Sequence, residues 1–280
     1  MKYSKLVFSL VFFSCACVNG GGNKETKEAL NDSNVQQTQV MDIDSNHVDI
    51  QTSKPTLNMP IDTSHIETRD VNPEAKGFVL VRNVIPDVIE DVRYYSDYNF
   101  VGTRIDGYEE PVVMLTKEAA EALKRVADYL RPQGYILKLY DGYRPKRAVE
   151  HFCRWAENVN DTTMKAVFYP DINKSEVFKL GYLAHRSGHT RGSTIDLTLY
   201  DTKEQKDVDM GGTFDFFGKV SHTFYDGLTK QQKENRMLLR NAMMKFGFKG
   251  MRSEWWHFTL INEPYKNKYF DFPVSTRPVN

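Results

Sequence analysis

Four residues in two short segments are of the types that bind metals and move protons. They supply the imidazoles of His189 and His257 and the carboxylates of Asp196 and Glu254. A catalytic zinc site uses three protein ligands and leaves a fourth position open for water. We therefore predict that His189, Asp196 and His257 hold one zinc ion and that Glu254 stays free to act as a general base.

The elements around these residues must bring them together. His189 precedes a predicted strand that contains Asp196, and the Gly192 turn between them lets the chain fold back. His257 belongs to a second predicted strand. Positions 254 and 257 of a regular strand point to opposite faces, so Glu254 must lie in the loop before that strand or on a bulge.

Each of these residues also has an ordinary structural alternative. A single histidine in a turn is more often structural than a metal ligand. Asp196 lies in an apolar strand, where either an arginine or a metal must compensate a buried carboxylate. Glu254 precedes two tryptophans, and an apolar wall raises the pKa of a carboxylate, which suits a general base.

A third segment, 141–145, places Arg144 in a turn at the end of a predicted strand. Site residues often gather at such turns. The guanidinium of Arg144 could hydrogen-bond a developing oxyanion or a substrate carboxylate. The alternative is an ordinary turn arginine paired with Asp141, and the sequence leaves both open.

Hydrophobic periodicity predicts one α+β domain, with a mostly antiparallel central sheet flanked by helices and the metal site at the sheet. Thr229 with Gln232 forms a capping box at the start of a long helix. Two further helices are predicted to start at Thr116 and Pro145. The predicted strands are 78–81, 135–140, 195–200 and 256–261.

The N-terminal segment has the order of a secretory signal. Lys2 and Lys5 precede an apolar run that is followed by small residues, so we predict a signal peptide at 1–19. Cys15 and Cys17 stand at its end, where a bacterial lipoprotein carries its acylated cysteine. We expect an exported protein, either periplasmic or attached to the membrane as a lipoprotein facing the envelope. The alternative is a short anchor helix that is not cleaved.

Composition separates a polar segment from the folded part and excludes one class of partner. Residues 20–75 are polar and show no period, so we predict a flexible tether before a domain at 76–280. Lys and Arg number 37, and Asp and Glu also number 37. This neutral balance lacks the basic footprint of a nucleic-acid binder, so we expect no nucleic-acid partner.

Five stretches together resemble the VanX-type D-alanyl-D-alanine dipeptidases, a family within a wider group of zinc peptidases that act on peptidoglycan. The matches occur in family order and cover nearly the whole domain. They are 141–149, 187–199, 212–216, 254–258 and 269–274.

The resemblance implies a role for each matched residue. It implies zinc binding by the three predicted ligands, with Glu254 as the base and Arg144 as the group that stabilises the tetrahedral intermediate. It also implies substrate contacts. Asp215 would meet the free amino group, Ser187 would lie near the carboxylate, and Tyr95 would line the pocket.

The implied activity is zinc-dependent hydrolysis of D-alanyl-D-alanine, or a closely related dipeptide, in the bacterial cell envelope. Two alternatives remain open. The first is a peptidoglycan stem-peptide carboxypeptidase or endopeptidase with the same chemistry. The second is an inactive, zinc-stabilised binding module, against which the presence of Glu254 argues because a structural site needs no free carboxylate.

Overall fold

The computed structural model describes residues 72–277. The predicted signal at 1–19 and all but the last four residues of the predicted tether lie outside this range. Asn72 caps the 3-10 turn Pro73–Ala75, which opens the described chain. Within 72–277, no helix is both long and apolar enough to cross a membrane.

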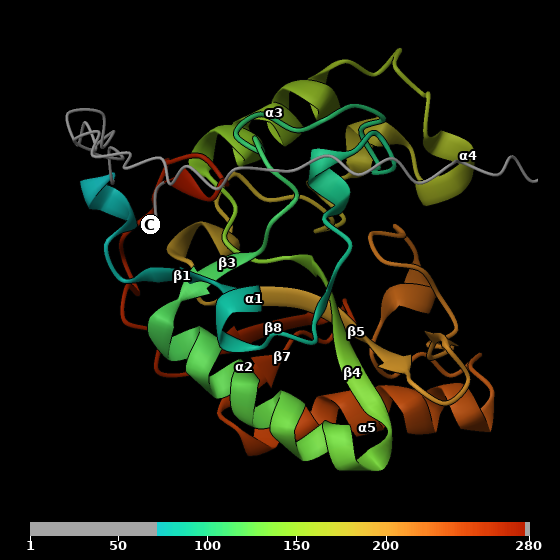
Figure 1. The fold of residues 1–280 in the computed structure, drawn as a ribbon. Helices are drawn as coiled ribbons and strands as arrows, with labels where there is room; N and C mark the ends of the chain where they lie inside the picture. The colour runs from blue at the N-terminus through green and yellow to red at the C-terminus, as the bar shows by residue number, and fades with distance from the viewer. Residues whose placement is uncertain (1–71, 278–280) are drawn as a thin grey trace, which may run out of the picture. The chain divides into compact units, whose positions relative to one another are not determined.

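A six-stranded sheet forms the centre of the fold (Figure 1). Its strands are β2 (Ile89–Glu90), β4 (Tyr135–Asp141), β5 (Thr194–Asp201), β6 (Lys206–Asp207), β7 (Phe248–Gly250) and β8 (His257–Leu260). The strand order is β2-β4-β5-β8-β7, with β6 paired to β5. The β2–β4 pair is parallel and the other pairs are antiparallel, which confirms the predicted α+β class.

A two-stranded antiparallel sheet lies beside the first. It consists of β1 (Phe78–Leu80) and β3 (Met114–Thr116). The prediction of a strand over 78–81 was wrong at its last residue, because Val81 begins the short helix α1 (Val81–Val84).

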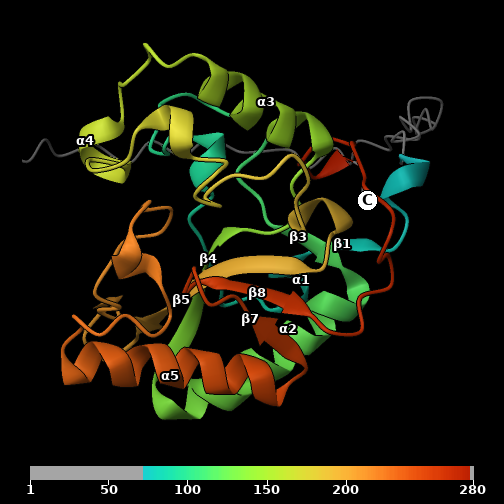
Figure 2. The same cartoon turned by 180° about the vertical axis from the view of Figure 1, so that it is seen from behind.

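Helices lie on both sides of the central sheet (Figures 1 and 2). α2 (Lys117–Leu130) and α5 (Lys230–Lys245) lie on one side, and α3 (Lys146–Glu157) and α4 (Lys165–Phe168) lie on the other. The capping box predicted for Thr229 and Gln232 is present at the start of α5. The Oγ1 atom of Thr116 accepts the N–H of Ala119 at the start of α2. These local signals therefore set the residues at which α5 and α2 begin.

The alternation of β5 prepares the site. Ile195, Leu197 and Leu199 are fully buried on one face of the strand. Successive side chains of a strand point to opposite faces, so Asp196 projects from the other face, toward the side that carries α3. The apolar residues stabilise the sheet, and on the opposite face of β5 Asp196 is the only carboxylate, between Thr194 and Thr198.

Candidate active site

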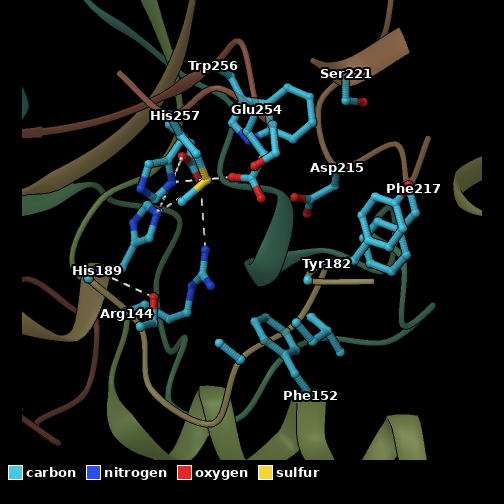
Figure 3. Close-up of a pocket in the computed structure, with 18 of the residues that line it drawn as sticks. Arg144, Phe152, Tyr182, His189, Asp215, Phe217, Ser221, Glu254, Trp256 and His257 are labelled. Atoms are coloured by element: carbon cyan, nitrogen blue, oxygen red, sulfur yellow. Dashed lines mark hydrogen bonds and ion pairs between the residues drawn. The ribbon is translucent and has the colours of Figure 1, made fainter. Parts of the chain in front are cut away.

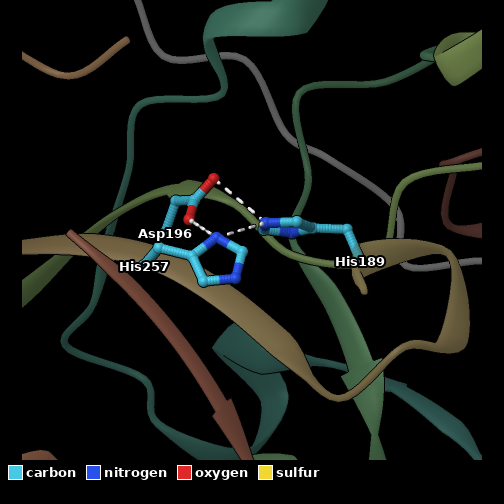
Figure 4. Close-up of side chains that lie close together, drawn as sticks. All are labelled: His189, Asp196 and His257. Carbon is cyan, nitrogen blue, oxygen red and sulfur yellow. Dashed lines mark hydrogen bonds and ion pairs between the residues drawn. The ribbon is translucent and has the colours of Figure 1, made fainter. Parts of the chain in front are cut away.

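The side chains of His189, Asp196 and His257 meet at one point of the sheet (Figure 4). Nε2 of His189 lies 3.2 Å from Oδ2 of Asp196, and Nδ1 of His257 lies 3.1 Å from Oδ1 of the same carboxylate. The two ring nitrogens are 3.3 Å apart. The structure thus brings together the three residues that the sequence proposes as metal ligands.

Strand pairing explains why Asp196 and His257 converge. In the antiparallel pairing of β5 with β8, the two residues are direct cross-strand partners. Such partners project from the same face of a sheet, so the carboxylate and the imidazole meet. Burial alone would raise the pKa of Asp196, but the adjacent rings of His189 and His257 hold it well below its usual value.

His189 reaches the same point from outside the sheet. It begins a 3-10 turn that ends at Gly192, whose φ is +80°. A Cβ at position 192 would lie 2.1 Å from the ring of Phe78, so the turn requires glycine for space as well as for its backbone. Nδ1 of His189 lies 2.7 Å from the carbonyl oxygen of Gly142. A carbonyl only accepts, so Nδ1 donates and Nε2 is left free toward Asp196.

This donor set fits a zinc ion. Tetrahedral zinc, with ligand bonds of about 2.0–2.2 Å, keeps its ligand atoms about 3.3–3.6 Å apart. Here the two imidazole nitrogens are 3.3 Å apart, and they lie 3.2 and 3.1 Å from the two different oxygens of the Asp196 carboxylate, slightly closer than that spacing. Oδ1 of Asp196 is buried, and no group among the described residues donates a hydrogen bond to it. A buried carboxylate oxygen without a donor calls for a cation.

Glu254 lies beside the donor set, in the loop that leads into β8, where the pleat argument requires it. Its Oε2 atom is 3.5 Å from Nδ1 of His257. Burial raises the pKa of Glu254, and the neighbouring His257 offsets this only in part. A carboxylate with a raised pKa at a metal site can take a proton from water near neutral pH.

Arg144 and Asp141 form a buried ion pair at the end of β4. Nε and Nη2 of Arg144 lie 2.9 and 2.8 Å from Oδ2 of Asp141. The hydroxyl of Tyr108 donates to Oδ1 of Asp141 at 2.5 Å. Nη2 of Arg144 also lies 3.6 Å from Oδ2 of Asp196. The ordinary pairing with Asp141 is therefore present, and it orients the guanidinium toward the donor set.

Asp215 lies in the same cavity, and its partner corrects one prediction. The hydroxyl of Tyr94 donates a 2.7 Å hydrogen bond to Oδ2 of Asp215. Tyr94 lines the cavity, whereas Tyr95, the predicted residue, does not. The two belong to one 3-10 turn, in which successive side chains point about 120° apart, so only one can face inward. The Tyr95 ring instead lies 5.7 Å from the guanidinium of Arg104.

The surroundings of Asp215 favour its neutral form. Burial raises the pKa of Asp215 well above its usual value, and the hydrogen bond from Tyr94 opposes this only in part. Its φ is +60°, in the left-handed region that few non-glycine residues adopt. Such a conformation persists where the surrounding structure holds it in place. A cationic group bound beside Asp215 would favour its charged form.

A cavity of about 380 Å³ collects these groups (Figure 3). The carboxylates of Glu254 and Asp215 point into it, and Arg144 lies on the side of the donor set. Ser187 lines the cavity as well, and its Oγ accepts the N–H of His189 at 3.2 Å. The structure therefore gathers every predicted site residue except Tyr95. It adds Tyr94, for which the sequence offers no signal beyond the adjacent pair of tyrosines.

Two imidazoles and a buried carboxylate, with a second carboxylate and a guanidinium around one cavity, have the composition of a metal-dependent hydrolase site. A family model described as D-ala-D-ala dipeptidase, Peptidase M15, matches residues 74–275. The chain therefore belongs to this peptidase family.

Individual relatives agree with the family. A protein of Enterococcus faecium named D-alanyl-D-alanine dipeptidase is 42% identical over 199 residues, covering 71% of this chain and 98% of the relative. A protein of the same name from Streptomyces coelicolor is 39% identical over 198 residues, with the same coverage of 71% and 98%. A solved structure of VanYB in complex with D-Alanine-D-Alanine aligns at a TM-score of 0.33 and 15% identity, covering 55% of this chain and 76% of that one.

Proposed function

We propose that this protein is a zinc-dependent dipeptidase that hydrolyses D-alanyl-D-alanine, or a closely related dipeptide, to free amino acids. One observation carries the proposal: a single cavity contains both the metal donor set, with Glu254 beside it, and a separate buried carboxylate. This second carboxylate is Asp215, which accepts a hydrogen bond from Tyr94. The names of the relatives at 39–43% identity support the same substrate.

The chemistry needs a proton acceptor and an oxyanion partner. His189, Asp196 and His257 would hold a zinc ion, which would supply the Lewis acidity that polarises a carbonyl and lowers the pKa of water. Glu254 takes a proton from the attacking water and returns it to the leaving amine. Arg144, oriented by its ion pair, donates hydrogen bonds to the developing oxyanion.

The restriction to dipeptides follows from charge. We assign the ammonium group of the substrate to Asp215 and its carboxylate to the part of the cavity wall that Ser187 lines. A longer peptide would place an uncharged amide against Asp215 and leave a buried carboxylate without its cation. A site built for a charged partner rejects substrates that lack it, because its own polar groups are then left unpaired.

We further propose one zinc ion per chain. The support is the single cluster of metal-binding side chains found among residues 72–277. Metal analysis of the purified protein should give about one zinc per chain. A ratio near two, or a retained metal other than zinc, would contradict this assignment.

We also propose export and acylation at Cys15 or Cys17, on the sequence pattern alone. Metabolic labelling with a fatty-acid analogue should label the wild-type protein. Comparison of Cys15→Ala with Cys17→Ala identifies the acylated residue, since one variant should lose the label. An unlabelled wild-type protein would remove the proposal.

The substrate assignment is tested by measuring free D-alanine released from three compounds. These are D-alanyl-D-alanine, its N-acetylated form, and a stem peptide that ends in D-alanyl-D-alanine. We expect turnover of the free dipeptide and at least about 100-fold lower kcat/KM for the other two. In both of them the nitrogen of the penultimate D-alanine is an amide, so the ammonium group that Asp215 would meet is missing at that position. Efficient cleavage of the stem peptide would favour the carboxypeptidase alternative, and zinc binding without any turnover would favour the binding module.

A further inference from the structure

A buried arginine of α5, Arg236, contacts a segment that lines the cavity. Arg236 is 1% exposed, and among the described residues it forms no ion pair with a carboxylate. Burial lowers the pKa of Arg236 to about 10, so the side chain is still charged at neutral pH. The only opposite charge acting on Arg236 among the described residues is the carboxylate of Asp209, which it does not contact directly. Burying a charge in this way is costly, and helix packing alone would favour an apolar side chain. The position therefore needs another explanation.

The guanidinium of Arg236 donates to three main-chain carbonyls. Nε donates to Met210 at 2.6 Å, Nη2 to Val220 at 2.8 Å, and Nη1 to His222 at 2.7 Å. A guanidinium offers five donors in a rigid fork, which suits several fixed acceptors. The three carbonyls bracket the segment that carries Asp215. One side chain of the helix thus holds both ends of that segment.

The guanidinium of Arg236 is also linked to the loop that carries Glu254, the proposed base. Ser221 lies between two of the bound carbonyls, and its own carbonyl accepts the N–H of Trp255 at 3.0 Å. Trp255 directly follows Glu254, and the guanidinium lies 5.6 Å from the centre of an aromatic ring of Trp255. Arg236 therefore joins the Asp215 segment to the Glu254 loop, although it touches neither carboxylate.

We propose that Arg236 is a positioning residue that sets the separation between the Asp215 and Glu254 carboxylates. The strained backbone of Asp215 needs such an external restraint. The expected effect on turnover rests on the proposed function, whereas the restraint itself does not. Displacing a reacting group by about 1 Å can lower the rate about 100-fold, so a loosened segment should lower turnover without removing any group from the cavity.

The test compares Arg236→Lys with Arg240→Lys. Lysine keeps the charge but loses the fork. Arg240 lies four residues further along α5 and packs on the ring of Phe224, 5.2 Å from its centroid, so it is a matched control. Per zinc-bound site, Arg236→Lys should lower kcat/KM by roughly 10–100-fold, and Arg240→Lys by less than about 2-fold. Equal values for the two variants would overturn the proposal.

Two readouts separate positioning from general destabilisation. In an Asp215→Asn background, Arg236→Lys should lower kcat/KM by less than about 3-fold, because residues that act through each other are not additive. An undiminished loss in that background contradicts the proposal. Amide hydrogen exchange of Trp255 and of segment 210–222 should be faster in Arg236→Lys while α5 stays protected. Unchanged exchange would also overturn it.

The exchange measurement is independent of activity. If the wild-type protein cleaves no dipeptide, the proposed function fails, and exchange still decides whether Arg236 restrains the segment. If the wild type is active and the two lysine variants behave alike, the positioning role alone fails. If the Arg236→Lys protein does not fold, Arg236→Gln replaces it, because glutamine is neutral and keeps two hydrogen-bond donors.

Discussion

The hydroxyl of Tyr94 donates a 2.7 Å hydrogen bond to the carboxylate of Asp215, across 121 residues of sequence. Both side chains are buried and line the cavity that holds the metal donor set. Tyr94 fixes the orientation of Asp215 at the place where the substrate ammonium is assigned.

Tyr94→Phe should weaken the dipeptide reaction. A hydrogen bond to a charged group contributes about 1.5–3 kcal/mol, so its loss should lower kcat/KM by roughly 10–100-fold, mainly through a higher KM. Tyr95→Phe is the matched control, because that side chain lies outside the cavity, and it should change kcat/KM by less than about 2-fold. Steady-state kinetics of the two variants decides the matter. A larger loss in Tyr95→Phe would show that the wrong tyrosine had been chosen.

Glu254→Gln should keep the metal and lose turnover. The amide has the same shape but cannot take a proton, and general base catalysis contributes about 10²–10⁴-fold. We expect kcat to fall by that factor while zinc content stays at the wild-type value. Glu150→Gln, a change at an exposed position of α3, provides the control. Substantial turnover in the zinc-loaded Glu254→Gln protein would contradict the role of this carboxylate.

Asp215→Asn should lower activity and raise stability at neutral pH. Burial raises the pKa of Asp215 in the folded protein, whereas the unfolded chain titrates near about 3.9. The folded state thus binds more protons between these values, and the free energy of unfolding falls as pH rises through that window. Asparagine carries no such penalty, and it can still accept from Tyr94.

Calorimetry of the zinc-free proteins tests this. The variant should melt a few degrees above the wild type at pH 7, since about 1 kcal/mol shifts the Tm of a domain of this size by roughly 2–4 °C. The difference in melting temperature between the two proteins should shrink as pH falls toward about 4, where the side chain at position 215 is neutral in both folded proteins. A wild type that is the more stable protein at pH 7 would contradict the sign of the pKa shift.

Chelation should abolish turnover without unfolding the domain. The ligands come from β5, β8 and one turn, and these elements are packed on apolar residues such as Ile195, Leu197 and Phe258, all 0–1% exposed. Zinc adds stability only through its binding equilibrium, so we expect a lower melting temperature with an unchanged far-ultraviolet circular dichroism spectrum at 25 °C. Loss of that spectrum on chelation would indicate a structural zinc site.

Much of this protein can be predicted from its sequence because the signals are local. The capping box of Thr229 with Gln232 and the cap at Thr116 mark helix starts within four residues. The alternation around Asp196 indicates a strand with Ile195, Leu197 and Leu199 on one face and Asp196 on the opposite face. The residue types of the proposed zinc ligands and of Glu254 are likewise visible without any knowledge of the fold.

Other features depend on packing between segments that are distant in the sequence. Whether Tyr94 or Tyr95 faces inward depends on how a short turn rests on the rest of the domain. That the ion pair with Asp141 also orients Arg144 toward Asp196 depends on where β4 ends relative to Asp196. A local sequence window specifies which donors and acceptors are present, but their directions are set only when the sheet and α3 enclose them.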